Sequence, residues 1–457
     1  MYKRIVIIGA GHCGGRVAEH LRKRGFRGSI SLIGCERHAP YERPSLSKGA
    51  LSKAALSKAA LVSEDSWDPE SITLLSPDKL AELEIDWIAG RNCIDIDPEQ
   101  QEVILDGNKR LRFDALVLAT GGSPIKLPLA GAGQPQVMYL RTRNDATAID
   151  SQLAPGKKVV VIGAGFIGLE VAASARMRGC EVTVLEAGSR PLARGLPVQT
   201  AEAISELHAQ HGVEIRTNVA ATSFEGTNGR LNRVMLLDEE PLPADLVVVG
   251  VGIRPNTELA HKAGLSIQDG ISTDAFGRTS HPAIWAAGDC ANAHNSRYNR
   301  PFRLESWKNA ELMAEVVAQE IIKDIISNLE IHLDSSQQYG FFNDQKEQLK
   351  DPEPAKETVS LENNAVPWLW SDQFEYGLQT TGFPADGDEI ITRIDGDLRI
   401  DFAFRDGKLI GAAGLAPGAK AARDIRLVQM MLEQGISPEP KDLANPAKKL
   451  KALLKGK

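Results

Sequence analysis

The sequence predicts an α/β protein with two Rossmann-like dinucleotide-binding domains and a smaller α+β domain at the C-terminal end. A pattern of strand, glycine turn, helix and strand starts near residue 4 and recurs near residue 158. Short strand-like segments separated by Asp-Gly turns follow residue 378. At 457 residues the chain is also too long for one hydrophobic core, which favours several domains.

The first glycine turn has the sequence GAGHCG and follows the apolar segment 4–8. In such a turn Gly9 forms the tight bend, Gly11 allows the backbone to approach a pyrophosphate, and Gly14 allows close packing of helix on strand. Glu36 comes just after the second strand, where a carboxylate can accept hydrogen bonds from a ribose. This combination predicts a dinucleotide site.

The second turn, at residues 163–168, repeats the pattern with Gly163, Gly165 and Gly168. Glu186 ends the second strand of this unit, and a carboxylate there repels the extra phosphate of NADP. We therefore expect NADH as the donor. Arg190 and Arg194 are close in sequence and leave NADPH open as an alternative.

Composition excludes several classes of function. A net charge of −7 argues against a nucleic-acid partner, which would need a concentrated basic face. The longest apolar region, 159–175, contains Glu170 and three glycines, so it does not predict a membrane span. We expect a cytoplasmic protein with reduced thiols and no metal site, because the five cysteines are scattered without a CxxC pair: Cys13, Cys35, Cys93, Cys180 and Cys290.

Further motifs occur in a fixed order along the chain. They are FDALVLATGG at 113–122, VVVGVGIRPN at 247–256 and IWAAGDCA at 284–291. With the two glycine turns, they resemble the pyridine-nucleotide-dependent flavoprotein family. YERPSLSKGAL at 41–51 and VPWLWSDQFEYGLQTTGFP at 366–384 resemble, more narrowly, the ferredoxin reductases that serve bacterial Rieske oxygenases and cytochromes P450.

This resemblance covers nearly the whole chain, apart from a polar stretch at about 327–364. Ser45 departs from it, because the family usually has a second proline there. The resemblance implies FAD as cofactor, with a hydride passed from NADH to FAD and single electrons then passed to a 2Fe-2S ferredoxin. Relatives that use cysteine chemistry carry it shortly after the first glycine unit, where this chain has residues 41–48 instead, so we expect the flavin itself to deliver the electrons.

The resemblance also implies roles for individual residues. Lys48 would lie beside the reactive flavin nitrogen, and Glu170 would pair with it near the nicotinamide, which makes these two the expected catalytic residues. Trp307 and Trp370 resemble residues that border the isoalloxazine, although each is equally consistent with core packing. The expected FAD residues are Gly9, Gly11, Gly14, Glu36, Arg43, Lys48, Thr120, Gly121, Gly288, Asp289 and Trp370. The expected NAD residues are Gly163, Gly165, Gly168, Glu186 and Gly252.

We expect an FAD-binding domain at 1–117 and 248–329, an NAD-binding domain at 118–247, a polar insertion or linker at 330–361 and a C-terminal α+β domain at 362–457. The triplet LSK occurs at residues 46, 51 and 56, and the two later copies favour a helical surface segment. A loop carrying Arg297, Arg300 and Arg303 is a candidate docking site for an acidic ferredoxin, and a solvated loop is the alternative.

Two other functions are compatible with the same motifs. One is an NADH oxidase, a rubredoxin reductase or another small-acceptor reductase. The other is a flavoprotein whose redox state controls association with partners, as in relatives of apoptosis-inducing factor. Fold alone does not decide between these functions.

Overall fold

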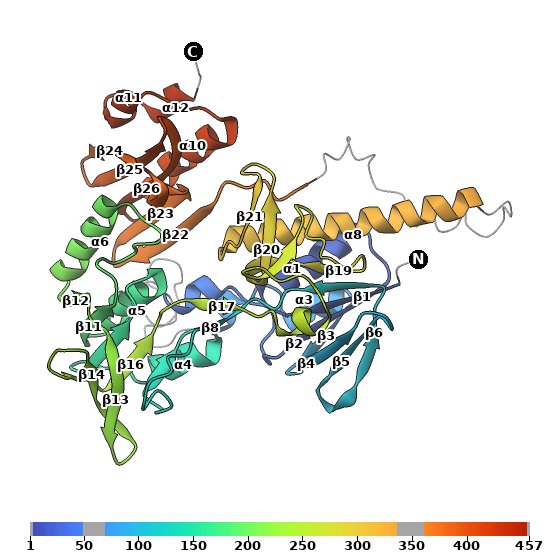
Figure 1. Cartoon of the computed structure of the whole chain (residues 1–457), viewed down its shortest axis with the longest axis horizontal. Helices are drawn as coiled ribbons and strands as arrows, with labels where there is room; N and C mark the ends of the chain where they lie inside the picture. The colour runs from blue at the N-terminus through green and yellow to red at the C-terminus, as the bar shows by residue number, and fades with distance from the viewer. Residues whose placement is uncertain (1–2, 49–68, 336–360, 455–457) are drawn as a thin grey trace. The chain divides into compact units, whose positions relative to one another are not determined.

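The computed structural model describes residues 3–48, 69–335 and 361–454, and its elements are labelled in Figure 1. The chain divides into two compact units. The first comprises Met1–Glu42, Ile72–Ser123 and Pro255–Ala365, and the second comprises Arg43–Ser71, Pro124–Arg254 and Val366–Lys457. Each unit is thus assembled from three separate stretches of sequence.

The first unit is built on a five-stranded parallel sheet with the order β19-β7-β1-β2-β3. Its strands are β1 (Arg4–Ile8), β2 (Ser29–Gly34), β3 (Ile85–Ala89), β7 (Ala115–Leu118) and β19 (Ile284–Ala286). Helix α1 (His12–Lys23) follows β1 directly, as the glycine pattern predicts. The long helix α8 (Trp307–Ser335) packs beside α1 (Figure 1).

The smaller elements of the first unit surround this sheet. An antiparallel sheet comprises β4 (Cys93–Asp97), β5 (Glu102–Leu105) and β6 (Arg110–Arg112). A mixed sheet contains β18 (Ile271–Thr273), β20 (Ala291–Asn295) and β21 (Arg300–Phe302), in which β20 pairs with β18 in parallel and with β21 antiparallel. The short helices are α3 (Pro77–Glu82), α7 (Glu258–Lys262), η3 (Asp106–Asn108) and η4 (Gly288–Cys290).

The second unit contains another five-stranded parallel sheet, with the order β12-β11-β10-β16-β9. Its strands are β9 (Val137–Tyr139), β10 (Lys158–Ile162), β11 (Glu181–Glu186), β12 (Val213–Thr217) and β16 (Leu246–Val249). The helices are η1 (Arg43–Leu46), α4 (Arg143–Asp150), α5 (Phe166–Met177) and α6 (Val198–Gln210). A meander adds β13 (Ala221–Thr227), β14 (Arg230–Leu236) and β15 (Leu242–Pro243). Three short elements carry the chain across the unit boundaries: η2 (Pro69–Ile72), β8 (Gly122–Pro124) and β17 (Ile253–Pro255).

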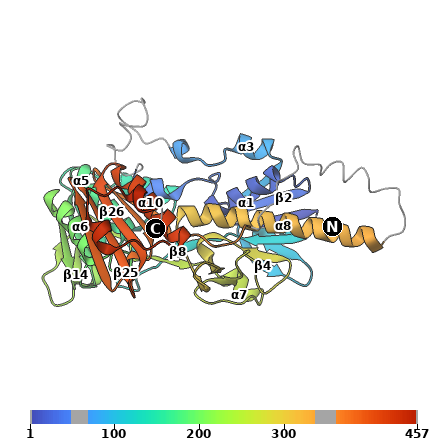
Figure 2. The same ribbon diagram turned by 90° about the horizontal axis from the view of Figure 1, so that it is seen from above.

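The C-terminal part of the second unit is a five-stranded antiparallel sheet with the order β22-β23-β26-β25-β24. Helix α10 (Lys420–Gln434) packs on β23 and β26 (Figure 2). The α+β prediction for this region is therefore confirmed. The strands are β22 (Trp368–Gln373), β23 (Tyr376–Gly382), β24 (Glu389–Asp395), β25 (Leu398–Arg405) and β26 (Lys408–Pro417), and the remaining helices are η5 (Pro384–Asp386), α11 (Pro440–Ala444) and α12 (Leu450–Leu453).

The central strands of both parallel sheets are apolar along their length because residues on both faces are buried. In β7 all four residues, ALVL, are buried, and in β16 all four residues, LVVV, are buried. Such strands show no alternation of polar and apolar residues, which is typical of a parallel sheet covered on both sides. The two Rossmann-like cores predicted from the sequence are confirmed.

Two predicted features fall partly or wholly outside the described residues. Helix α8 continues to Ser335, past the start of the polar stretch expected from residue 327. Residues 336–360 and the later LSK triplets within 49–68 lie outside the described ranges. The assignment of FAD to 1–117 and 248–329 and of NAD to 118–247 stays a prediction, as do the bounds of the linker at 330–361 and of the C-terminal domain at 362–457.

Candidate functional site

The glycine turn of the first unit leaves no room for side chains at two positions. Gly9 has a φ of 111°, and a Cβ there would lie 2.0 Å from the carbonyl oxygen of Ala119. A Cβ on Gly14 would lie 1.8 Å from the carbonyl oxygen of Gly9. Gly11 is the N-cap of α1 and makes no side-chain capping bond. The N–H groups of the first turn therefore stay available as hydrogen-bond donors to a phosphate. This turn fits a dinucleotide pyrophosphate.

The other residues predicted for FAD in the first unit follow neighbouring strands. Thr120 and Gly121 come after β7, and Gly288 and Asp289 come after β19. Because β19, β7 and β1 are adjacent parallel strands, their carboxyl ends form one edge of the sheet, which is where ligands bind in such folds. The structure thus brings these loops together beside the glycine turn.

Two contacts support this arrangement. The Thr120 hydroxyl donates to the carbonyl oxygen of Asn256 at 2.7 Å, which fixes the turn after β7. A Cβ on Gly288 would lie 3.0 Å from Cβ of Cys13, so the turn that carries Asp289 abuts the first turn of α1.

Glu36, predicted to bind a ribose, accepts a 2.6 Å hydrogen bond from the Tyr41 hydroxyl.

The second glycine turn repeats this geometry. Gly163 has a φ of 100°, and a Cβ on Gly168 would lie 2.0 Å from the carbonyl oxygen of Gly163. Gly165 caps α5 without a side-chain bond, and no atom lies within 4 Å of the position its Cβ would take. The space beside Gly165 and the open N–H donors of α5 fit a second pyrophosphate.

Glu186 is held at this turn by the backbone. Its carboxylate accepts hydrogen bonds from the N–H groups of Ala164 at 2.9 Å and Gly188 at 2.7 Å. Each oxygen keeps a lone pair for a ribose hydroxyl. The Arg190 guanidinium donates to three carbonyl oxygens of its own loop, at 3.0–3.4 Å. Arg194 has a nitrogen 3.8 Å from the position that a Cβ on Gly252 would take.

Lys48 and Glu170, predicted as the catalytic pair, meet in the second unit. Lys48 follows η1, and its Nζ lies 3.6 Å from Oε1 of Glu170 in α5 and 3.3 Å from Oδ2 of Asp372 in β22. The same Nζ lies 4.7 Å from the ring centre of Trp370, a cation–π distance. The side chains of Lys48 and Glu170 are only 13% and 3% exposed, so water screens this pair weakly.

Burial dominates the electrostatics of Glu170. Removal from water raises the pKa of its carboxyl above the usual value, and the nearby Lys48 ammonium opposes that rise. Two hydroxyl groups oppose it further: Ser371 donates to Oε1 and Ser47 donates to Oε2, each at 2.5 Å.

Sequence reasoning missed the residues that support this pair. Ser47, Ser371, Gln373 and His208 are buried and hydrogen-bonded to Glu170 directly or in series. The segment WLWSDQ carried a signal, because Ser371 and Gln373 alternate on the buried face of a strand. His208 carried none, because its partner is 165 residues away.

Trp370 and Arg43 also belong to the second unit. Trp370 stacks on Trp368 at 5.3 Å and is half-buried, so it is not a core residue. The Arg43 guanidinium donates to the carbonyl oxygen of Arg141 at 2.6 Å. In the first unit, Trp307 donates to Glu42 at 3.2 Å and packs edge-on against His12.

The arginines predicted to dock a ferredoxin lie on a β-hairpin rather than a loop. Strands β20 and β21 pair His294 with Pro301 and Asn295 with Arg300. Arg303 is only 13% exposed and pairs with Asp269 at 3.1 Å and with Glu305. Its charge is therefore used within the unit. Arg297 and Arg300 are exposed, and the Arg297 guanidinium donates to the carbonyl oxygen of Asn364 at 3.0 Å.

Four of the five cysteines are poor redox groups. All five are free, and burial raises the pKa of Cys13, Cys180 and Cys290 and that of Cys93 to about 11. A raised pKa disfavours the reactive thiolate.

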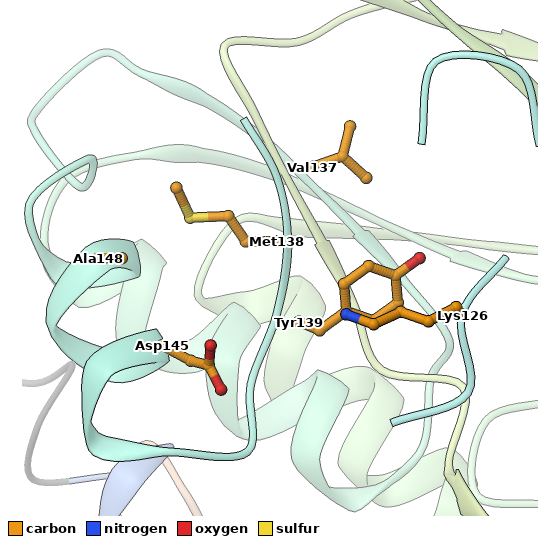
Figure 3. Close-up of a pocket in the computed structure, with 6 residues that line it drawn as sticks. All are labelled: Lys126, Val137, Met138, Tyr139, Asp145 and Ala148. Carbon is orange, nitrogen blue, oxygen red and sulfur yellow. The ribbon is translucent and has the colours of Figure 1, made fainter. Parts of the chain in front are cut away.

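The second unit has a cavity of about 220 Å³ between β9 and α4, where Lys126 lies 3.5 Å from the ring centre of Tyr139 (Figure 3). It contains none of the predicted site residues. Within the described parts of the chain, acidic, cysteine and histidine side chains form no cluster of three that could hold a metal. No helix among these residues is long and apolar enough to cross a membrane.

Two glycine turns built for pyrophosphates and a buried lysine–glutamate pair define a pyridine-nucleotide-dependent oxidoreductase. The chain belongs to the pyridine nucleotide-disulphide oxidoreductase family, whose sequence model matches residues 3–314, and a reductase C-terminal model matches residues 368–454. Together with the relatives below, this membership implies FAD as cofactor and NADH as donor, as the motifs predicted.

The relatives match this chain along most of its length. The ferredoxin--NAD(+) reductase component of the anthranilate 1,2-dioxygenase system of Burkholderia cepacia is 34% identical, covering 98% of both chains. Putidaredoxin reductase of Pseudomonas putida is 36% identical, covering 85% of this chain and 82% of the relative. Among solved structures, the covalent putidaredoxin reductase–putidaredoxin complex matches with a TM-score of 0.84 at 32% identity, covering 99% of this chain and 98% of that one.

Other solved structures extend the comparison. The ferredoxin reductase for the CYP199A2 system of Rhodopseudomonas palustris matches with a TM-score of 0.83 at 32% identity, covering 98% of this chain and 99% of that one. A water-forming NADH oxidase from Lactobacillus brevis, at 18% identity, shares the fold with a TM-score of 0.80, covering 99% of this chain and 97% of that one. At that identity the likeness concerns the fold alone. The relatives above 30% identity are ferredoxin reductases, which favours that activity over the oxidase and partner-binding alternatives.

Proposed function

We propose that this protein is an NADH-dependent reductase of a 2Fe-2S ferredoxin that supplies a Rieske oxygenase or a cytochrome P450. The observation that carries the proposal is Lys48: a buried cation paired with Glu170 stands in the segment where relatives that use cysteine chemistry carry a thiol. Burial raises the pKa of four of the five cysteine thiols and so disfavours their thiolates, and the flavin would deliver the electrons.

The two glycine turns would bind the two dinucleotides. The turn at Gly163, Gly165 and Gly168 would bind the NADH pyrophosphate, and Glu186 would bind the ribose and disfavour NADPH. The turn at Gly9, Gly11 and Gly14 would hold the FAD pyrophosphate.

FAD, when bound, accepts two electrons from a hydride donor and gives them up singly. Lys48 would place a positive charge where the reduced ring gains electron density, and Glu170 would hold that charge in position. Trp370 would limit access of water to the same place.

The partner and the compartment are part of this proposal. A ferredoxin of acidic character would be drawn to Arg297 and Arg300, because local charge controls encounter even when the net charge is −7. We place the activity in the cytoplasm on the basis of the five free cysteines.

The test is NADH-driven reduction of cytochrome c with and without purified 2Fe-2S ferredoxins encoded near this protein. Turnover should depend strongly on one of them, and NADH should outperform NADPH. Rapid oxygen consumption without a ferredoxin would instead support an oxidase. Slow flavin reduction and a long-lived charge-transfer complex would support the partner-binding alternative.

A further inference from the structure

A chain of hydrogen bonds runs through the second unit and ends on Glu170. His208 Nε2 lies 2.9 Å from Oε1 of Gln373, and Gln373 Nε2 donates to the Ser371 hydroxyl at 2.8 Å. Ser371 then donates to Oε1 of Glu170 at 2.5 Å. The four side chains come from three elements, α6, β22 and α5, and all are buried.

An ionised Glu170 would set the direction of every bond in this chain. An ionised carboxylate only accepts hydrogen bonds, so the Ser371 hydroxyl must donate to it. The Ser371 oxygen then accepts the amide N–H of Gln373, which turns the amide oxygen of Gln373 toward His208. His208 must therefore carry its proton on Nε2, and all three donors point toward Glu170.

The environment of His208 keeps it in this neutral form. Burial lowers the pKa of His208 to about 4, so the ring stays uncharged at neutral pH. Its Nδ1 has no hydrogen-bond partner among the described residues, as expected of an imidazole whose single proton is used on the other nitrogen. Phe374 packs edge-on against the ring at 5.0 Å and fixes its orientation.

The charged groups near the chain are few. Lys48 faces Glu170 from the segment after η1, and Asp372 of β22 faces Lys48 from the solvent side. At the far end His211, which pairs with Glu375 at 3.1 Å, lies near His208. Lys48 is the only one of these groups that favours ionised Glu170 by its charge.

We propose that Gln373 and His208 are positioning residues that aim the Ser371 hydroxyl at Glu170 and so keep Glu170 ionised beside Lys48. The purpose of that charge rests on the proposed reductase function, but the chain itself does not. Aligned hydrogen bonds polarise one another. The bond that His208 donates to Gln373 therefore still strengthens the bond from Ser371 to Glu170, although His208 does not contact Glu170. Gln373 and His208 thereby join α6 and the C-terminal sheet to the Lys48–Glu170 pair.

The test is the protonation midpoint of Glu170, measured by infrared spectroscopy of its carboxyl stretch and assigned with Glu170→Gln. It uses the purified holoprotein without NADH or ferredoxin. Ser371→Ala should raise the midpoint by about one pH unit or more, because a hydrogen bond to the charged form is lost. Gln373→Leu and His208→Phe should raise it by a smaller amount, about half a unit.

Two controls separate positioning from packing. Ser371→Thr keeps the hydroxyl and should leave the midpoint near that of the parent protein. Thr381→Val, in the adjacent strand β23, removes a buried hydroxyl that has no partner among the described residues, and it should leave the midpoint unchanged. Gln373→Met, of similar length, replaces Gln373→Leu if the latter does not fold.

An unchanged midpoint in folded Gln373→Leu (or Gln373→Met) and His208→Phe proteins would overturn the proposal. The pH profile of flavin reduction by NADH should shift in parallel with the midpoint. Failure of every ferredoxin to accept electrons would refute the reductase function and leave the infrared result standing, so the two proposals fail separately.

Discussion

Removal of Lys48 should destabilise the protein in a way that depends on pH. In Lys48→Met the 3.6 Å contact to Glu170 is lost while Glu170 stays 3% exposed. Breaking a buried pair and leaving one charge behind costs about 3–5 kcal/mol. The second contact of Lys48, to Asp372, adds only about 0–1 kcal/mol because Asp372 is 53% exposed. Since two hydroxyl groups still bind Glu170, we expect a loss of about 3 kcal/mol at alkaline pH.

The sign of the pH dependence follows from the pKa of Glu170, which burial raises. When a group has a higher pKa in the folded protein than in the unfolded chain, its protonation stabilises the folded state. This contribution is complete at pH values below the pKa of the unfolded chain, and it is lost as the pH rises through the pKa of the folded protein. Without Lys48 the folded pKa rises further. The variant should therefore lose less stability at acid pH than at alkaline pH.

The assay is urea unfolding followed by circular dichroism at an acid and an alkaline pH, with excess FAD in every sample so that cofactor loss does not contribute. The double variant Lys48→Met/Glu170→Gln should recover most of the loss at alkaline pH, because no buried charge remains. An equal loss at both pH values, or no recovery in the double variant, would refute the reasoning. The single variant should also slow hydride transfer or lower the flavin potential while FAD stays bound.

Four further predictions concern other parts of the chain. Glu186→Gln should lower the ratio of kcat/KM for NADH over NADPH by roughly tenfold, since a like-charge clash is removed, whereas Glu214→Gln should not; wild-type use of both donors alike would contradict the assignment. Reversing the charges of Arg297 and Arg300 should slow ferredoxin reduction at low salt by roughly tenfold and leave flavin reduction by NADH intact, and equal turnover would remove the β20–β21 hairpin from the docking site. The buried Arg393 is only 4% exposed, and its guanidinium donates to the carbonyl oxygens of Leu443, Asn445, Pro446 and Lys448. Arg393→Leu should therefore lower the free energy of unfolding in urea by about 3 kcal/mol and make the C-terminal tail accessible to protease. Deletion of residues 336–360 should spare flavin reduction, and loss of bound FAD would contradict this.

The sequence predicted those parts of the molecule whose physical cause is local. Gly9 and Gly163 were identifiable because a positive φ and a close backbone contact admit no other residue. The strands after residue 378 were identifiable from their alternation and Asp-Gly turns. Lys48 and Glu170 are 122 positions apart in the sequence, and no spacing rule pairs residues at that distance. Only the family resemblance predicted this pair.

The supporting residues were not predictable for the same reason. Ser371 bonds Glu170 across 201 residues, and Gln373 bonds His208 across 165. Such contacts depend on how α6 and β22 pack, which no local pattern encodes. The hairpin at β20–β21 was also missed, because Arg300, Pro301 and Phe302 form a strand too short to show a period.

The β22 strand places two kinds of chemistry on opposite faces at consecutive positions. Ser371 and Gln373 are fully buried and bond to residues of α5 and α6. Trp370 and Asp372, which alternate with them along the strand, contact Lys48. Because successive side chains of a strand alternate in direction, a slip of one residue would exchange the two sets at once. Loop grafting or domain exchange aimed at a new acceptor must therefore preserve the register of β22 against β23, and a shift of that register by one residue should abolish both faces together.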